Sequence, residues 1–134
     1  MSSDPARAAV SWQKATAHLL EAEAQDADAS PMAVIHSSYY AMFHAARAVR
    51  FKATGQAPNR HDAAIQRFGL LVRDLDDAVR AAGRAFNRVK DDRTAADYDE
   101  LVAPTPEDAR ESVAAAKDFL AISGVRYGFG PPGA

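Results

Sequence analysis

Apolar residues recur at alternating steps of four and three along two long segments of the chain. In residues 31–54, a segment that Gly55 is expected to end, the repeating positions are Ile35, Tyr39, Met42, Ala46 and Val49. In the segment that ends near residue 98 they are Val79, Ala82, Phe86, Val89, Arg93 and Ala96. This spacing places side chains on one face of an α-helix, so both segments are predicted to be long helices with a buried stripe. Arg93 stands where the pattern calls for an apolar side chain.

Start and stop signals predict two further helices in the first half of the chain. Asp4 followed by Pro5 begins a helix that runs to about Ala24. Its expected inward residues are Val10, Ala17 and Leu20. Pro58 and Asn59 begin another helix that ends near Arg73. Its expected inward residues are Ile65, Phe68 and Leu71.

A last helix follows a proline-containing break. Thr105 is its N-cap, with Asp108 in the third helical position, and Gly124 is its expected end. Its expected inward residues are Ala109, Val113, Ala116 and Leu120. Residues 125–134 are rich in glycine and proline and are predicted to be an irregular or disordered tail.

These elements predict one all-α domain over residues 1–124, an antiparallel up-and-down bundle of four long helices plus a shorter fifth helix. The abundance of alanine and the scarcity of Val, Ile and Thr favour close-packed helices over sheet. No apolar run approaches the roughly 20 residues that span a bilayer, so we expect a cytoplasmic protein without a membrane segment.

Composition limits the chemistry. The 134 residues include no cysteine, which excludes disulfides, thiolate metal sites and cysteine nucleophiles. With 16 Lys plus Arg against 18 Asp plus Glu, the chain is not a generally basic nucleic-acid coat, although a local basic site remains open. His36 and His44 lie eight residues apart with no carboxylate between them, so we expect no metal site. Glycine-rich phosphate loops are absent from the sequence, and no cofactor is expected.

Arg93 is the first candidate for function. Burying an unpaired guanidinium costs several kcal/mol, so Arg93 must face a carboxylate or a solvent-filled groove. Asp97 lies one helical turn further on, and Tyr98 brings a hydroxyl to the same neighbourhood. The alternative is an intrahelical ion pair between Arg93 and Asp97 with a purely structural role.

A second stripe on the helix over residues 31–54 carries aromatic and titratable groups. It comprises His36, Tyr40, then Phe43 or His44, then Arg47. Such groups suit stacking on a base and contact with a phosphate. They also suit a homodimer interface, in which tyrosine and arginine are enriched.

Arginines form a third pattern, because Arg80, Arg84 and Arg88 recur at every fourth residue. A line of this kind can track a nucleic-acid backbone. The alternative is a solvated helix face that is neutralised locally by Asp76, Asp77, Asp91 and Asp92.

Taken together, these motifs resemble the HEPN domain family, in its small stand-alone prokaryotic branch. The resemblance covers about residues 6–120 and is carried by the run Ser38-Tyr-Tyr-Ala-Met-Phe-His-Ala-Ala-Arg-Ala48, by Gly55 and His61, and by Arg93-Thr-Ala-Ala-Asp-Tyr98. It implies a helical bundle that usually dimerises, with a functional groove where the ends of the fourth helices meet. It also implies one of several roles: a metal-independent ribonuclease, often a toxin of toxin-antitoxin or defence systems, a partner of a minimal nucleotidyltransferase, or a nucleotide-binding module.

The family ribonucleases use an arginine followed four to six residues later by a histidine. Arg93 matches that arginine, but Tyr98 stands where the histidine would be. Tyrosine, with a pKa of about 10, is a poor base near neutral pH. The leading hypothesis is therefore a dimer that binds nucleotide or RNA through Arg93, Asp97 and Tyr98, with Tyr40 and Arg47 nearby. Two alternatives remain: an RNase toxin in which His44 or His61 replaces the missing histidine, and a protein interaction module for a nucleotidyltransferase or antitoxin partner.

Overall fold

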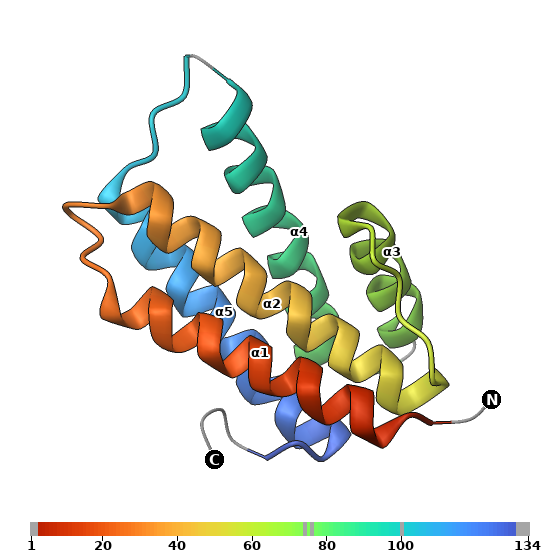
Figure 1. The fold of residues 1–134 in the computed structure, drawn as a ribbon. Coiled ribbons are helices and arrows are strands. Elements are labelled where there is room, and N and C mark those ends of the chain that lie inside the picture. The colour runs from red at the N-terminus through yellow and green to blue at the C-terminus, as the bar shows by residue number, and fades with distance from the viewer. Residues whose placement is uncertain (1–2, 74, 76, 100, 131–134) are drawn as a thin grey trace.

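A computed structural model describes residues 3–73, 75, 77–99 and 101–130, and these residues form five α-helices (Figure 1). They are α1 (Pro5–Ala24), α2 (Pro31–Thr54), α3 (His61–Val72), α4 (Asp77–Tyr98) and α5 (Pro106–Tyr127). The all-α bundle of four long helices and a shorter one is confirmed, and the short helix is the third. Along the described residues, none of the helices combines the length and the apolar character needed to cross a membrane.

Helix α2 is the centre of the bundle and packs against each of the other four helices. On one side, α1 and α5 lie along it (Figure 1). On the other side, α3 and α4 pack against α2 and against each other. A backbone hydrogen bond of 2.9 Å from Asp4 N–H to the Phe51 carbonyl ties the start of α1 to the end of α2.

The helix boundaries follow local side-chain and backbone chemistry. The Asp4 carboxylate accepts from the backbone N–H of Arg7 at 3.1 Å and caps α1. Gly55 ends α2 with φ of 79°, a left-handed conformation that glycine adopts without steric cost. Thr105 and Asp108 form a reciprocal capping box at the start of α5. These three predicted signals are confirmed.

Four helices meet at aromatic side chains in the core. The Phe86 ring on α4 lies 5.9 Å from Tyr39 on α2, 6.4 Å from Phe68 on α3 and 5.4 Å from Phe119 on α5, centroid to centroid. All four residues are at most 1% exposed. The predicted inward stripes of α2 and α4 are confirmed at Ile35, Tyr39, Met42, Ala46, Val49, Val79, Ala82, Phe86 and Val89. The side chain of Ala96, the last predicted member, lies outside the described part of the structure.

The predicted inward face of α1 is wrong. Val10 and Leu20 are 50% and 60% exposed, and Ala17 is exposed as well. The face that packs against α2 carries Ala8, Trp12, Ala15, Leu19 and Ala22. Both faces have helical apolar spacing, but the alanine face lets the two backbones approach closely while Trp12 and Leu19 supply the buried volume.

The predicted end of α5 at Gly124 is also wrong, because the helix continues to Tyr127 and ends at Gly128 with φ of 78°. Gly124 permits a close approach: a Cβ there would overlap the carbonyl oxygen of Gly130 and lie 3.2 Å from the Trp12 ring. The Phe129 ring stacks on Trp12 at 4.6 Å. Residues 125–130 are thus helical or packed, and residues 131–134 of the predicted tail lie outside the described residues.

Candidate functional site

Arg93 projects from the last turns of α4 toward α2. Its guanidinium carbon lies 5.0 Å from the centroid of the Tyr39 ring and 5.7 Å from that of Tyr40, which is within cation–π range. The side chain is 19% exposed. The sequence pattern predicted an inward position for Arg93, and the two tyrosine rings replace the apolar neighbours that such a position normally has.

Asp97 connects Arg93 to α2. One carboxylate oxygen, Oδ2, lies 3.5 Å from Arg93 Nε, so the predicted ion pair is present. The other, Oδ1, lies 2.7 Å from Nε2 of His36. The 3.5 Å contact is too long for a good hydrogen bond, and Arg93 Nε is buried without a hydrogen-bond partner among the described residues. The carboxylate therefore holds His36 closely and leaves hydrogen-bonding capacity on Arg93.

Tyr39 and His61 form the second pair of the site. The Tyr39 hydroxyl lies 2.6 Å from Nδ1 of His61, the first residue of α3. Burial raises the pKa of Tyr39 to about 12, and the positive charge of Arg93 opposes that rise. The pKa of His61 is lowered, chiefly by burial and then by Arg93. Both groups are consequently uncharged near neutral pH.

Two neutral groups can share this hydrogen bond in either direction, and the position of Arg93 beside the Tyr39 ring favours one of them. A nearby positive guanidinium attracts the lone pairs of the phenol oxygen, so the Tyr39 proton points toward His61. Nδ1 of the neutral imidazole then accepts this hydrogen bond, and Nε2 carries the ring proton. In this state His61 offers an N–H donor rather than a base.

Aromatic rings surround His61. Phe43 stacks on its imidazole at 4.3 Å and Tyr40 meets it edge-on at 5.6 Å. The site thus combines a cation, Arg93, and an N–H donor, His61, with aromatic walls from α2. We refer to Arg93, Asp97, His36, Tyr39, Tyr40 and His61 as the Arg93 cluster.

His44 is separate from Arg93 in the described contacts. Its ring stacks on His18 of α1 at 5.3 Å, and its Nδ1 is buried without a hydrogen-bond partner among the described residues. Burial, followed by the charge of His18, lowers the pKa of His44 to about 4. Of the two candidate replacement histidines, His61 is the one that the fold brings to the Arg93 cluster.

Two other predicted site residues lie elsewhere. Arg47 donates to the Pro58 carbonyl at 3.2 Å and to Asn59 Oδ1 at 2.9 Å, so it holds the connection between α2 and α3. Tyr98 is 77% exposed, and no contact with Arg93 is recorded among the described residues. The hundred-degree step between consecutive helical residues turns Tyr98 away from the face that carries Arg93.

Sequence reasoning missed the pairing of His36 with Asp97 and the polar role of Tyr39. His36 was visible in the second stripe of α2, but its partner is 61 residues away along the chain. Tyr39 fitted the apolar stripe and is fully buried, so the periodicity indicated a core residue and gave no sign that its hydroxyl belongs to the site. Among the residues that the structure describes, no group of three His, Cys, Asp or Glu is placed to hold a metal ion.

A comparison with protein families matches the HEPN domain over residues 8–125. The chain belongs to the HEPN domain family. No curated protein and no solved structure matches it. Membership in the HEPN family suggests a function connected with nucleotides or RNA in general, and it confirms the resemblance drawn from the α2 and α4 motifs.

Proposed function

We propose that this HEPN domain binds a nucleotide or RNA by placing a phosphate against Arg93. The observation that carries the proposal is the state of the guanidinium: it is mostly buried and held over two tyrosine rings, and its Nε has no hydrogen-bond partner among the described residues. Phosphate oxygens are strong acceptors for arginine. The His61 N–H supplies a second donor beside it.

Aromatic side chains give this site the means to recognise a base as well as a phosphate. Tyr40 is partly exposed and contacts both Arg93 and His61. A base that stacks on such a ring gains roughly 1–3 kcal/mol. A phosphate on Arg93 with a base against Tyr40 is the arrangement that these contacts favour.

Calorimetric titration with a mononucleotide and with a short RNA tests the proposal. Arg93→Ala removes a charge-assisted contact worth roughly 1.5–3 kcal/mol, so affinity should fall about 10- to 100-fold. Arg88→Ala, on an exposed position of the same helix, is the matched control and should bind as the unmodified protein does. If Arg93→Ala lowers the melting temperature and leaves binding unchanged, Arg93 is structural and the proposal is wrong.

Asp97→Asn should change the affinity in the direction opposite to Arg93→Ala. The Asp97 carboxylate competes with a phosphate for the guanidinium, so its neutralisation should strengthen anion binding by up to about fivefold. Weaker binding in Asp97→Asn would instead mean that the carboxylate serves to position Arg93. The experiment therefore separates competition from positioning.

A second candidate, RNA cleavage, is favoured by one observation: His61 lies in the Arg93 cluster although it is remote from Arg93 in the sequence. Cleavage needs a group that takes a proton from the 2′-hydroxyl and one that protonates the leaving oxygen. The lowered pKa of His61 leaves little of the protonated form at neutral pH, and Nδ1 is occupied by Tyr39. We therefore expect binding without efficient cleavage. Incubation with labelled RNA, beside His61→Ala, tests this; rapid cleavage lost in His61→Ala would establish the enzyme.

A dimer is part of the proposal. HEPN domains often dimerise, and the exposed apolar residues Val10 and Leu20 on α1 provide surface for a partner. Sedimentation equilibrium measures the oligomeric state directly. A nucleotidyltransferase or antitoxin is the other partner class that the family membership suggests, and co-purification with the products of neighbouring genes tests it.

A further inference from the structure

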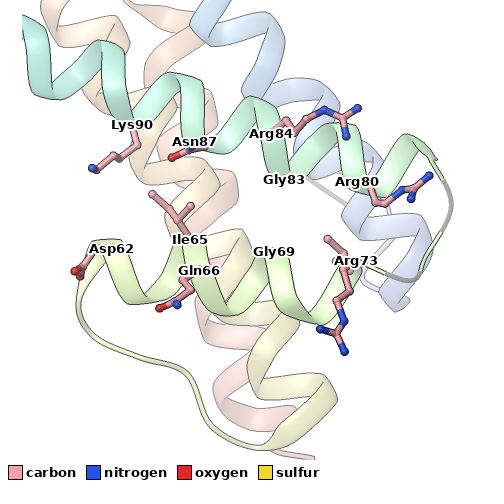
Figure 2. A pocket seen from close by; sticks show the side chains of 11 residues that line it. Asp62, Ile65, Gln66, Gly69, Arg73, Arg80, Gly83, Arg84, Asn87 and Lys90 are labelled. Atoms are coloured by element: carbon pink, nitrogen blue, oxygen red, sulfur yellow. The ribbon is translucent and has the colours of Figure 1, made fainter.

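A groove of about 530 Å³ lies between α3 and α4, next to the Arg93 cluster (Figure 2). Ile65 points into the gap between the helices, and Gly69 and Gly83 face it from α3 and α4 (Figure 2). A Cβ at Gly69 would meet nothing within 4 Å. The floor is therefore apolar and open, and its volume is in the range of ligand-binding clefts.

Basic side chains ring this groove. Arg73, Arg80, Arg84 and Lys90 line it, against a single carboxylate, Asp62, among its described lining residues. Figure 2 shows the charged ends of Arg80, Arg84 and Lys90 directed outward from α4, so they lie on the rim rather than on the floor. Arg80 forms an ion pair with Asp77, and Lys90 lies 4.0 Å from Asp91, while no ion pair is recorded for Arg84 among the described residues. Local neutralisation of the arginine line is therefore partial, and Asp76 lies outside the described residues.

On both helices, the groove ends a few residues from a member of the Arg93 cluster. Asp62 directly follows His61, and Lys90 precedes Arg93 by less than one helical turn. The cationic rim on α4 extends from Arg80 to Lys90, which is about 15 Å at the helical rise. A stacked strand advances about 3.4 Å per nucleotide, so this length corresponds to about four nucleotides.

We propose that the groove between α3 and α4 binds single-stranded RNA and leads it to the Arg93 cluster. Phosphates lie on the rim cations, and bases enter the gap against Ile65 and the two glycines. Gln66 and Asn87, which also line the groove, carry amides that can donate to and accept from base edges. The Asp62 oxygens accept from Arg60 and from the Ala63 N–H, and their remaining lone pairs can accept from a 2′-hydroxyl, which only RNA provides. This inference rests on the proposed function and narrows its ligand from nucleotides in general to an RNA strand.

Fluorescence anisotropy with a labelled eight-nucleotide RNA of mixed sequence tests the groove. In the double variant Arg84→Gln/Lys90→Gln, RNA affinity at low salt should fall at least about tenfold, because two charged contacts are lost. The slope of log affinity against log salt should become shallower by about 1.4, since each phosphate contact on a single strand contributes about 0.7. Arg88→Gln, one turn along α4 but outside this groove, is the matched control and should change neither quantity.

Binding measurements with a mononucleotide separate this inference from the proposed function. Arg84→Gln/Lys90→Gln should leave mononucleotide binding unchanged, whereas Arg93→Ala should weaken it. If the RNA binds no more tightly than the mononucleotide, or the double variant binds RNA normally, the groove assignment is overturned and the Arg93 site stands. If neither ligand binds the unmodified protein, both are overturned.

Two competitors complete the test. DNA of the same sequence should bind more weakly than RNA, and equal affinity would overturn the assignment to RNA. A poly-glutamate peptide of matched charge should compete poorly, because it has no bases for the floor of the groove. Equal competition by the peptide would make the groove a general anion surface and overturn the inference.

Discussion

The two sides of α2 are packed in different ways. On one side, α1, α5 and the residues after α5 approach closely through small side chains, with Gly124 against Gly130 and Trp12 stacked on Phe129. On the other side, α4 is bordered by two grooves of about 530 and 540 Å³, one shared with α3 and one with α5. Both sides bury core side chains, such as Trp12 on α1 and Phe86 on α4, but only the open side holds the Arg93 cluster and the basic rim. Substitutions on the close-packed side should therefore change stability without changing binding.

The largest effect on stability is expected for Trp12→Ala. Trp12 is 8% exposed and joins α1 to the end of α5 through Phe129. Removing a large buried aromatic side chain costs about 3–5 kcal/mol. Urea unfolding followed by circular dichroism measures the change in the free energy of unfolding.

Leu70→Ala on α3 is the control for Trp12→Ala. Leu70 is 52% exposed, so its truncation should change the free energy of unfolding by no more than about 0.5 kcal/mol. Equal losses in the two variants would mean that the buried contacts of Trp12 add nothing to stability, and the role given to Trp12 would be wrong.

Gly124→Ala should destabilise the protein by about 1–3 kcal/mol, because the added Cβ forces apart α5 and the backbone at Gly130. The Trp12 ring on the other side of the new methyl group leaves little room for adjustment. Thermal unfolding measures the loss. RNA and nucleotide binding at temperatures below the transition should be unchanged, since this side carries no part of the candidate site.

The difference between the two sides explains what the sequence could predict. Helix boundaries follow from local signals such as Gly55 and the Thr105 cap, so they were predictable, and so were the stripes of α2 and α4. Gly124 was misread because a glycine that ends a helix and one that permits a close approach have the same local sequence signature. Only the contact with Gly130, made by the chain after it has turned back, distinguishes them.

In the candidate site too, local contacts were predictable from the sequence and contacts between distant segments were not. The ion pair between Arg93 and Asp97 joins residues one helical turn apart, so it was predictable from their spacing. His36 and His61 were candidates, but they meet their partners Asp97 and Arg93, 61 and 32 residues away, only through helix packing. No periodicity within one helix could reveal these contacts. Tyr98 was placed in the site because it follows Asp97, and Arg47 because it belongs to the second stripe of α2. Helical rotation turns Tyr98 away, and Arg47 holds the loop before α3.

Stability should also depend on pH through His44, which lies where α1 meets α2. Its pKa is about 4 in the folded protein and 6.5 in the unfolded chain, so the unfolded state binds more protons between these values. The free energy of unfolding should therefore decrease as pH falls from about 6.5 toward 4. Burial is the main cause, and positive charge from His18, Arg47, Lys14 and His61 adds to it. Allowing for solvent screening, we expect on the order of 1–2 kcal/mol.

His44→Gln isolates this contribution, because glutamine does not titrate. The measured quantity is the difference in free energy of unfolding between the two proteins at pH 7 and at pH 5. That difference should shrink at the lower pH. The unmodified protein loses the stability that depends on a neutral His44, whereas the variant has no such contribution to lose. Parallel pH profiles for the two proteins would show that His44 titrates alike in both states.

The smallest effect, and the one of opposite sign, is expected for Gly69→Ala on the open side. Gly69 is in the body of α3, where glycine costs about 0.5–1 kcal/mol relative to alanine, and a Cβ there meets nothing within 4 Å. The substitution should raise the free energy of unfolding by that amount, whereas the same substitution at Gly124 lowers it. Side-by-side thermal unfolding of the two variants compares one chemical change on the two sides of the molecule. A loss of stability in both would show that α3 packs as tightly as α5, and the division between a close-packed side and an open side would have to be abandoned.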